Sequence, residues 1–310
     1  MTAPGNKTVA VLQGGWSSER EVSLTGGRQI VTALREAGYT VREIDVQRDL
    51  GGLIDQLTPR PDVVYNALHG RFGEDGCIQG VLEILGIPYS HSGLLASALA
   101  MDKAMAKRLF ESAGIPCAPH SIVTREQYER GEMPAPPYVI KPINEGSSVG
   151  VHIVRTAADA DAIDEDVFAH GDRVMVERFV DGRELTVSVM GDRPLGVTEI
   201  RPVEGFYDYE AKYTEGRAEH FVPAPIHPDV YARAMDYAVR AHEAIGCRGV
   251  SRSDFLYDDR AGEPGELFII EINTQPGMTP LSLVPEQAAH VGIGFGQLVS
   301  WMVENATCDY

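Results

Sequence analysis

The residues best suited to metal chemistry lie in one stretch, Phe268–Ser282, which reads FIIEINTQPGMTPLS. Its first half predicts a strand, and side chains two apart on a strand share a face, so Glu271 and Asn273 point the same way. The apolar positions point into a core: Phe268, Ile270 and Ile272. A carboxylate beside an amide oxygen suits Mg²⁺, which prefers hard oxygen ligands.

A second strand is expected upstream, at Val250–Tyr257, and the turn-rich segment DDRAGEPGE between the two strands predicts an antiparallel hairpin. If the loop is centred midway, Asp254 faces Glu271 and Arg252 faces Asn273. Like charges directly opposite each other destabilise a sheet, and a divalent cation would remove that conflict. The alternative is a solvated hairpin with cross-strand charges.

Two lysines lie where phosphate groups could bind. Tyr138–Pro142 and Val149–Val154 predict two strands around the Gly/Ser loop INEGSS, whose backbone N–H groups could cradle a phosphate. The loop lacks the GxxxxGK[ST] pattern and precedes a strand, so it is no P-loop; an ordinary hairpin loop is the alternative. Lys141 strengthens the phosphate hypothesis, because a buried unpaired lysine is costly. Lys103 lies in the first turn of an expected helix from Asp102 to about Ala113, where a cation opposes the helix dipole.

A purine site is a weaker hypothesis. Arg173–Val180 and Arg183–Met190 flank an Asp-Gly pair, which predicts a tight β-hairpin. In that register Glu177, Phe179 and Glu184 share a face, where an aromatic ring and two carboxylates could hold a purine and its ribose. An amphipathic hairpin explains the same pattern equally well.

The N-terminal part predicts the elements that must carry a ligand site at a sheet edge. Strands are expected at Lys7–Leu12, Val41–Val46 and Asp62–Leu68, and Ser18 with Glu21 fits a capping box for a helix to about Ala37. This β-α-β order favours a parallel sheet with ligand loops at the strand C-terminal ends, and the absence of GxGxxG disfavours a dinucleotide. The third strand runs into HGRFGEDG, which indicates a ligand-facing His69, although a buried packing histidine is the alternative.

The remaining elements are simpler. Helical spacing at residues 78–85 precedes a strand beginning at Ile87, and further helices are expected at Asp229–Ile245 and Phe295–Asn305. Glu204–Ala224 has no period of either kind but carries three tyrosines, which argues against disorder and favours a lid.

Composition narrows the function classes. At 310 residues the chain predicts two or three domains. The net charge of −18 argues against a nucleic-acid partner. Four dispersed cysteines without a CxxC pair indicate neither zinc nor disulfides. With no signal-like run and no membrane-spanning segment, a cytoplasmic protein is expected.

Together the motifs closely resemble one family, the D-alanine–D-alanine ligases of the ATP-grasp superfamily. They cover nearly the whole chain in order: GGWSSEREVSL, HGRFGEDG, MDK, IKPINEGSSVGV, YDYEAKY, SRSDF and EINTQPGMTPLSLVP. The resemblance implies a mixed α/β ATP-grasp fold, with a Rossmann-like substrate domain at 1–92, a central subdomain at 93–180, and a C-terminal domain at 181–310 carrying the metal site and lid. Trp16 departs from the family, which usually has a small residue there, and Phe179 occupies a hinge site where other members carry other large side chains.

The resemblance also implies the ligands. The Mg²⁺ ligands, for two ions that Mn²⁺ could replace, would be Asp254, Glu271 and Asn273. The nucleotide ligands would be Lys103, Lys141, Glu145, Ser147, Ser148, Glu177, Phe179, Val180, Glu184 and Lys212. The D-alanine sites would be formed by Glu19, His69, Arg252, Gly277, Ser282 and Leu283. The catalytic set would be Glu19, Ser147, Tyr213, Arg252 and Ser282.

The resemblance implies joining of two D-alanines with cleavage of ATP to ADP and phosphate, for peptidoglycan synthesis, in a homodimer whose partners are small molecules. Two rivals stay open: a ligase on the same scaffold with another acceptor, such as D-lactate, and a non-catalytic nucleotide-binding relative. In the family a tyrosine at position 213 goes with dipeptide rather than ester synthesis. A non-catalytic relative would lack a metal ligand or phosphate lysine, and none is missing.

Overall fold

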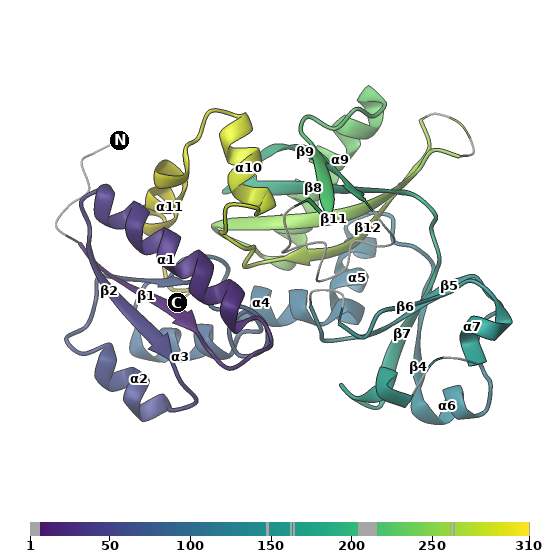
Figure 1. The fold of residues 1–310 in the computed structure, drawn as a ribbon, viewed down its shortest axis with the longest axis horizontal. Helices are drawn as coiled ribbons and strands as arrows, with labels where there is room; N and C mark the ends of the chain where they lie inside the picture. The colour runs from purple at the N-terminus through teal and green to yellow at the C-terminus, as the bar shows by residue number, and fades with distance from the viewer. Residues whose placement is uncertain are drawn as a thin grey trace.

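The computed structural model describes residues 7–146, 149–161, 163, 165–203, 216–260, 262 and 264–309. These residues form three β-sheets with helices packed against them, arranged side by side in an elongated molecule (Figure 1). Each sheet comes from one part of the chain, but the last helix returns to the first sheet.

The first sheet has the order β2-β1-β3 and is parallel, as the sequence predicted. Its strands are β1 (Thr8–Gly14), β2 (Thr40–Val46) and β3 (Val63–Asn66). Alternate side chains pack on opposite faces: one face is covered by α1 (Arg20–Glu36) and α11 (Phe295–Glu304). The other is covered by α2 (Leu50–Gln56) and α3 (Cys77–Leu85). The sheet is therefore buried on both sides, and its loops are what remain for a ligand.

The start of α1 differs from the prediction of a capping box at Ser18. The N-cap residue is Glu19, and its side chain makes no capping hydrogen bond. Ser17 holds this turn instead: its hydroxyl accepts a hydrogen bond from the Glu19 N–H (3.2 Å) and donates one to the His69 carbonyl (2.7 Å). As a result the turn before α1 is tied to the loop after β3, and the Glu19 carboxylate is not used as a cap.

The second sheet, with the order β4-β7-β5-β6, is antiparallel. Its strands are β4 (His120–Thr124), β5 (Tyr138–Pro142), β6 (His152–Val154) and β7 (Arg173–Arg178). Short helices complete this lobe: α6 (Arg125–Glu129), α7 (Ala157–Asp161) and a 3₁₀ turn, Glu165–Phe168. The predicted pairing of the strands around the Gly/Ser loop is confirmed as β5 and β6.

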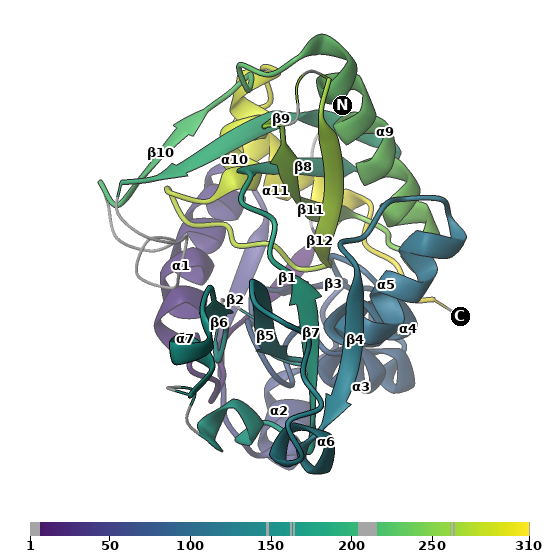
Figure 2. The same ribbon diagram turned by 90° about the vertical axis from the view of Figure 1, so that its right-hand side faces the viewer.

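The third sheet has the order β10-β9-β8-β11-β12. Its strands are β8 (Arg183–Met190), β9 (Arg193–Pro202), β10 (Ala218–Phe221), β11 (Val250–Asp258) and β12 (Glu266–Asn273). One face packs on α4 (Leu94–Met101), α5 (Lys103–Ser112) and α9 (Pro228–Ile245) through a large apolar core. The helix α10 (Leu283–His290) contacts β8 and β9, and the sheet with its helices is seen in Figure 2.

The hairpin predicted at Asp181-Gly182 is wrong. Among the described residues, β7 pairs with β4 and β5 of the second sheet, and β8 pairs with β9 and β11 of the third, so the Asp-Gly pair carries the chain from one sheet to the other. Gly182 is required there for another reason: a Cβ at this position would lie 2.7 Å from the Tyr257 carbonyl oxygen. The close approach of two backbones, rather than a tight turn, explains the glycine.

The hairpin of β11 and β12 is confirmed, with Asp254 opposite Glu271 and Arg252 opposite Asn273. A β-bulge follows, because Phe255 pairs with Ile269 and leaves Ile270 as the extra residue. The expectation that Ile270 points into the core is therefore wrong; Ile269 is buried in its place, and Ile270 is half-buried.

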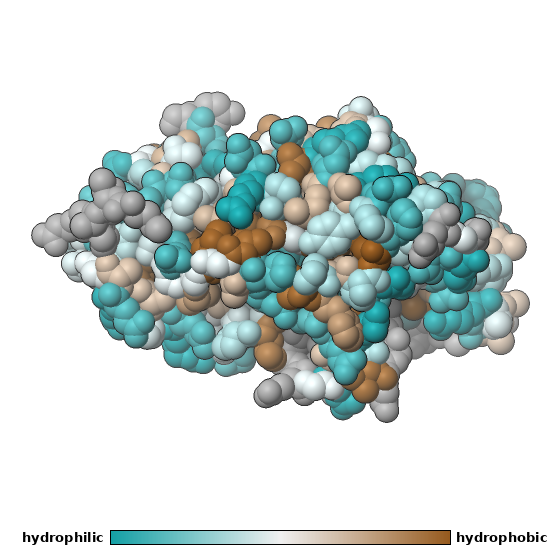
Figure 3. Space-filling view, turned by 90° about the horizontal axis from the view of Figure 1, so that it is seen from above, coloured by the Kyte–Doolittle hydropathy of each residue, from teal (hydrophilic) through white to brown (hydrophobic). Residues whose placement is uncertain are grey.

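Other expectations are corrected in part. Residues 218–221 of the expected irregular lid form β10, whereas 204–215 lie outside the described residues. The strand expected at Ile87 is limited to isolated bridges at Tyr89, which pairs with Val64 on one side and with Thr307 on the other. None of the helices in the described ranges is long and apolar enough to cross a membrane. The face shown in Figure 3 is mostly hydrophilic, with apolar residues in small separate patches.

Candidate active site

Two cavities meet between the sheets. The larger, about 840 Å³, lies between the second and third sheets, and the smaller, about 90 Å³, lies between the third sheet and the loops of the first. Both are lined by Lys103, Glu145, Gly146 and Glu271. The Lys103 ammonium donates to the Glu145 carbonyl (2.6 Å) and lies 3.1 Å from the Glu271 carboxylate. Among the described residues, these four are the ones that line both cavities, and we call them the junction.

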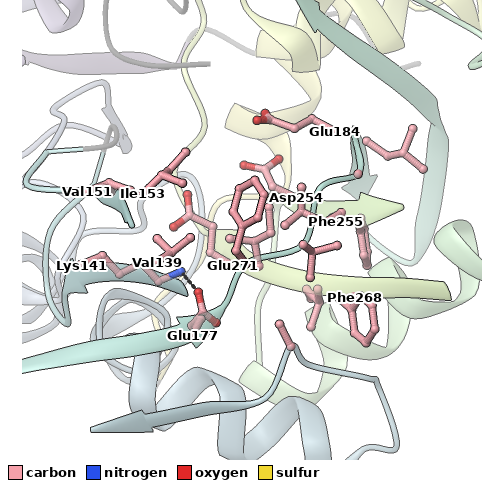
Figure 4. A pocket seen from close by; sticks show the side chains of 18 of the residues that line it. Val139, Lys141, Val151, Ile153, Glu177, Glu184, Asp254, Phe255, Phe268 and Glu271 are labelled. Carbon is pink, nitrogen blue, oxygen red and sulfur yellow. Dashed lines mark ion pairs between the residues drawn. The ribbon is translucent and has the colours of Figure 1, made fainter. Parts of the chain in front are cut away.

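The larger cavity collects the described nucleotide ligands that the sequence predicted. Besides the junction residues, its lining includes Lys141, Glu177, Phe179, Val180 and Glu184. In Figure 4 the Lys141–Glu177 pair comes from one side, whereas Asp254 and Glu184 come from strands on the other. Val139, Val151, Ile153 and Phe268 supply apolar walls. Ser147, Ser148 and Lys212 lie outside the described residues.

A buried charge cluster forms the floor of this cavity. The Glu177 carboxylate contacts two ammonium groups: that of Lys141, and that of Lys107 at 2.6 Å. Burial alone would raise the pKa of Glu177, but Lys141 and Lys107 outweigh it and lower that pKa to about 2. Burial lowers the pKa of Lys141, an effect that Glu177 partly offsets. Lys141 is therefore not the unpaired buried lysine that the sequence argument assumed.

The expected metal ligands lie where the two cavities meet. Asp254 and Glu271 are cross-strand neighbours, and the Asn273 side-chain oxygen accepts a hydrogen bond from the Gln275 N–H (2.8 Å). Arg252 forms a two-point ion pair with Asp254 (2.9 and 2.7 Å).

This donor set fits a hard divalent cation, because two carboxylates and an amide oxygen lie close together on one face of the β11–β12 hairpin. The third ligand is an amide: among the described residues, at this site as elsewhere, no three His, Cys, Asp or Glu side chains gather closely enough to hold a metal ion.

The smaller cavity collects the predicted substrate residues. Its lining includes Glu19, His69, Arg252, Gly277, Ser282 and Leu283, whereas Tyr213 lies outside the described residues. The Ser282 hydroxyl accepts a hydrogen bond from the Thr279 N–H (2.9 Å), which fixes the turn beside Gly277.

His69 lies in this cavity with an acidic neighbour. Its Nδ1 is 3.9 Å from a Glu74 carboxylate oxygen, and both side chains are almost fully buried. Burial alone would lower the pKa of His69, but Glu74 and Glu19 outweigh it and raise that pKa. Burial raises the pKa of Glu74. The cavity thus places the Arg252 guanidinium and the His69 ring near the Glu19 carboxylate, which suits a small zwitterion with both an ammonium and a carboxylate.

Comparison with known proteins agrees with this geometry. The sequence matches the family described as D-ala D-ala ligase C-terminus over residues 109–304, and the one described as D-ala D-ala ligase N-terminus over residues 50–92. The chain belongs to the D-alanine–D-alanine ligase family. It is 59% identical to the D-alanine–D-alanine ligase of Acidiphilium cryptum, over 97% of this chain and 99% of the relative. It is 58% identical to that of Parvibaculum lavamentivorans, over 98% of each.

Solved structures place this ligase among ATP-grasp proteins. The D-alanine–D-alanine ligase of Bacillus anthracis complexed with ATP superposes with a TM-score of 0.82 at 30% identity, over 97% of each chain. The VanG D-Ala:D-Ser ligase of Enterococcus faecalis superposes with a TM-score of 0.81 at 30% identity, over 97% of this chain and 99% of that one. The fold is therefore common to ligases with different named acceptors.

Two residues at or directly behind the cavities, Lys107 and Glu74, were missed by sequence reasoning. Lys107 follows Lys103 by one helical turn on α5, a spacing that places both on one face, and this was the signal that could have found it. Glu74 lies in the HGRFGEDG motif, but its burial against His69 depends on a tertiary contact that no local pattern reports.

Proposed function

We propose that this chain joins two D-alanines into D-alanyl-D-alanine, with ATP cleaved to ADP and phosphate through an acyl-phosphate intermediate. The observation that carries the proposal is the meeting of the two cavities at Lys103 and Glu271. The larger cavity has a volume typical of ligand sites. A nucleotide bound there would direct its terminal phosphate at a small carboxylic acid bound in the smaller cavity.

In the first step a carboxylate oxygen of the first D-alanine attacks the γ-phosphorus, and the bond to ADP breaks. Phosphoryl transfer needs positioning and charge neutralisation more than covalent help. Lys103 and Lys141 supply positive charge, while Glu19 and His69 orient the amino acid. Mg²⁺ held by Asp254, Glu271 and Asn273 would neutralise further phosphate charge.

In the second step the amine of the other D-alanine attacks the acyl carbon. Negative charge develops on the acyl oxygen, where Arg252 and the Gly277 N–H are the proposed donors. One such donor is commonly worth about 3 to 4 kcal/mol. The C–O bond then breaks, phosphate leaves, and the amine loses a proton.

Further parts of the proposal go beyond the chemistry. We take the three sheets as the cores of three domains at 1–92, 93–180 and 181–310, with Ser147, Ser148, Lys212 and Tyr213 completing the site. The protein would work in the cytoplasm as a homodimer. The presence of one sheet in each range supports the domain bounds, and the family membership supports the added site residues.

The test is phosphate release with ATP and D-alanine as the sole amino acid, followed by product analysis with D-alanine, D-serine and D-lactate at equal concentration. We expect D-alanyl-D-alanine to dominate at neutral pH. Predominant D-alanyl-D-serine or ester would overturn the acceptor assignment but leave the ligase chemistry. No phosphate release with any acceptor would overturn the function itself.

A further inference from the structure

Lys107 is a fully buried lysine with no role in the chemistry above. It is 0% exposed, its ammonium is 2.6 Å from Glu177 Oε1, and it lies 3.5 Å from the Ile269 carbonyl of β12. Lys103, one turn earlier on α5, lines both cavities, whereas Lys107 is not among the described residues that line either. Lys107 therefore does not reach a ligand in this geometry.

Glu177 pairs with two lysines, of which only one lines the larger cavity. Lys107 is enclosed between α5, β7 and β12, but Lys141 lines the larger cavity, where a bound ligand would contact it. A nucleotide phosphate would compete with Glu177 for the Lys141 ammonium. If Lys141 moved away without a second cation present, a buried carboxylate would be left unpaired, which is strongly unfavourable.

We propose that Lys107 is a positioning residue of the nucleotide site: it is the resident counter-ion of Glu177, and it leaves Lys141 available to the phosphates of ATP. This inference rests on the proposed function, because it takes ATP as the ligand of the larger cavity. Two lysines of α5 would then serve the nucleotide site: Lys103 at the junction of the cavities, and Lys107 behind the larger cavity as the partner of Glu177.

The first test is Lys107→Met, which removes the charge and keeps the length. Affinity for ADP with Mg²⁺, measured by calorimetry, should fall roughly 10- to 100-fold, and KM for ATP should rise alongside while KM for D-alanine changes little. Lys107→Arg should restore most of the affinity. Lys7→Met, a charge removal at a half-exposed lysine paired with Glu304, is the matched control and should bind like the wild type.

The second test separates positioning from general loss of structure. In a double-mutant cycle, Lys107→Met should weaken ADP binding in the wild-type background but not in the Glu177→Gln background, since no buried carboxylate then retains Lys141. If the single variant does not fold, the double variant is compared with Glu177→Gln alone, and equal ADP affinity is expected.

Folded Lys107→Met with wild-type affinity, or a double variant that binds more weakly than Glu177→Gln, would overturn the proposal. Failure of the wild type itself to bind adenine nucleotides would instead overturn the proposed function.

Discussion

Glu271 is a proposed metal ligand that also lines both cavities. We expect Glu271→Gln to reduce turnover by more than the roughly 10- to 100-fold that follows loss of an outer-sphere partner, because a neutral amide cannot balance a divalent cation. Turnover is measured across a Mg²⁺ titration, and far-UV circular dichroism checks that the fold is kept. Glu266→Gln, on the same strand but exposed and outside both cavities, is the control. Near-normal turnover of Glu271→Gln at ordinary Mg²⁺ would contradict the assignment.

Glu177 predicts a pH dependence of stability. Its folded-state pKa is lowered to about 2, so its ion pairs stabilise the fold above its ordinary pKa of 4.5, and this contribution is lost as the pH falls toward 2. The pH-dependent part of the difference in unfolding free energy between wild type and Glu177→Gln, on the order of 3 kcal/mol at most, should therefore be lost between pH 5 and 2. Urea unfolding at several pH values measures it. A difference that stays constant over this window would contradict the ionised pairing.

The positions of site residues could be predicted from the sequence where they depend only on strand pairing within one hairpin. A single short hairpin fixes which side chains of two strands face each other, so the pairing of Asp254 with Glu271 follows from the sequence. The partner of Lys141 does not, because Glu177 and Lys107 come from distant segments that only the packing of α5 on two sheets brings together.

At the scale of elements, Gly182 marks where the chain crosses between sheets. A Cβ there would lie 2.7 Å from the Tyr257 carbonyl oxygen and 3.0 Å from its carbon, and this backbone atom belongs to a central strand. We expect Gly182→Ala to reduce the free energy of unfolding by about 1 to 3 kcal/mol, the usual effect of overpacking.

The control is Gly296→Ala in α11, where a Cβ meets nothing within 4 Å and which should be neutral or slightly stabilising. Equal stability of the two variants would show that the crossing can relax. The same glycine explains why the prediction of a hairpin at Asp181-Gly182 failed. An Asp-Gly pair is a strong local turn signal. Here, however, the glycine is needed because a neighbouring strand passes close by, and the local sequence does not reveal that strand.

At the scale of the molecule, Arg248 joins distant parts of the chain. Its guanidinium donates to the carbonyls of Tyr89 (3.0 Å) and His91 (2.8 Å) and to Asp309 (3.1 Å), and Asp309 in turn accepts from the Leu94 N–H at the start of α4. The chain's last described residue thus caps a helix that ends beside the smaller cavity. Such long-range ties are invisible in a sequence read segment by segment.

We expect Arg248→Leu to lower the free energy of unfolding by about 2 to 3 kcal/mol, because charged hydrogen bonds are worth roughly 1.5 to 3 kcal/mol and buried carbonyls lose a donor. Arg260→Leu, which removes an exposed arginine paired with Asp258 and Asp181, should change it by less than about 1 kcal/mol. Chemical denaturation of both variants provides the comparison. If Arg260→Leu lowered the free energy of unfolding as much as Arg248→Leu does, the stabilising role proposed for the Arg248 hydrogen bonds would be contradicted.

The central claim is that a phosphoryl group passes from ATP in the larger cavity to the carboxylate of a D-alanine in the smaller cavity. It is tested most directly with D-alanine labelled with ¹⁸O in both carboxylate oxygens. If that carboxylate attacks the γ-phosphorus and the C–O bond later breaks, each inorganic phosphate released with dipeptide carries one ¹⁸O atom. Mass spectrometry of the phosphate, normalised to the dipeptide formed, gives the ratio. We predict one labelled oxygen per phosphate; unlabelled phosphate alongside D-alanyl-D-alanine would contradict the acyl-phosphate route and the use proposed for the cavity junction.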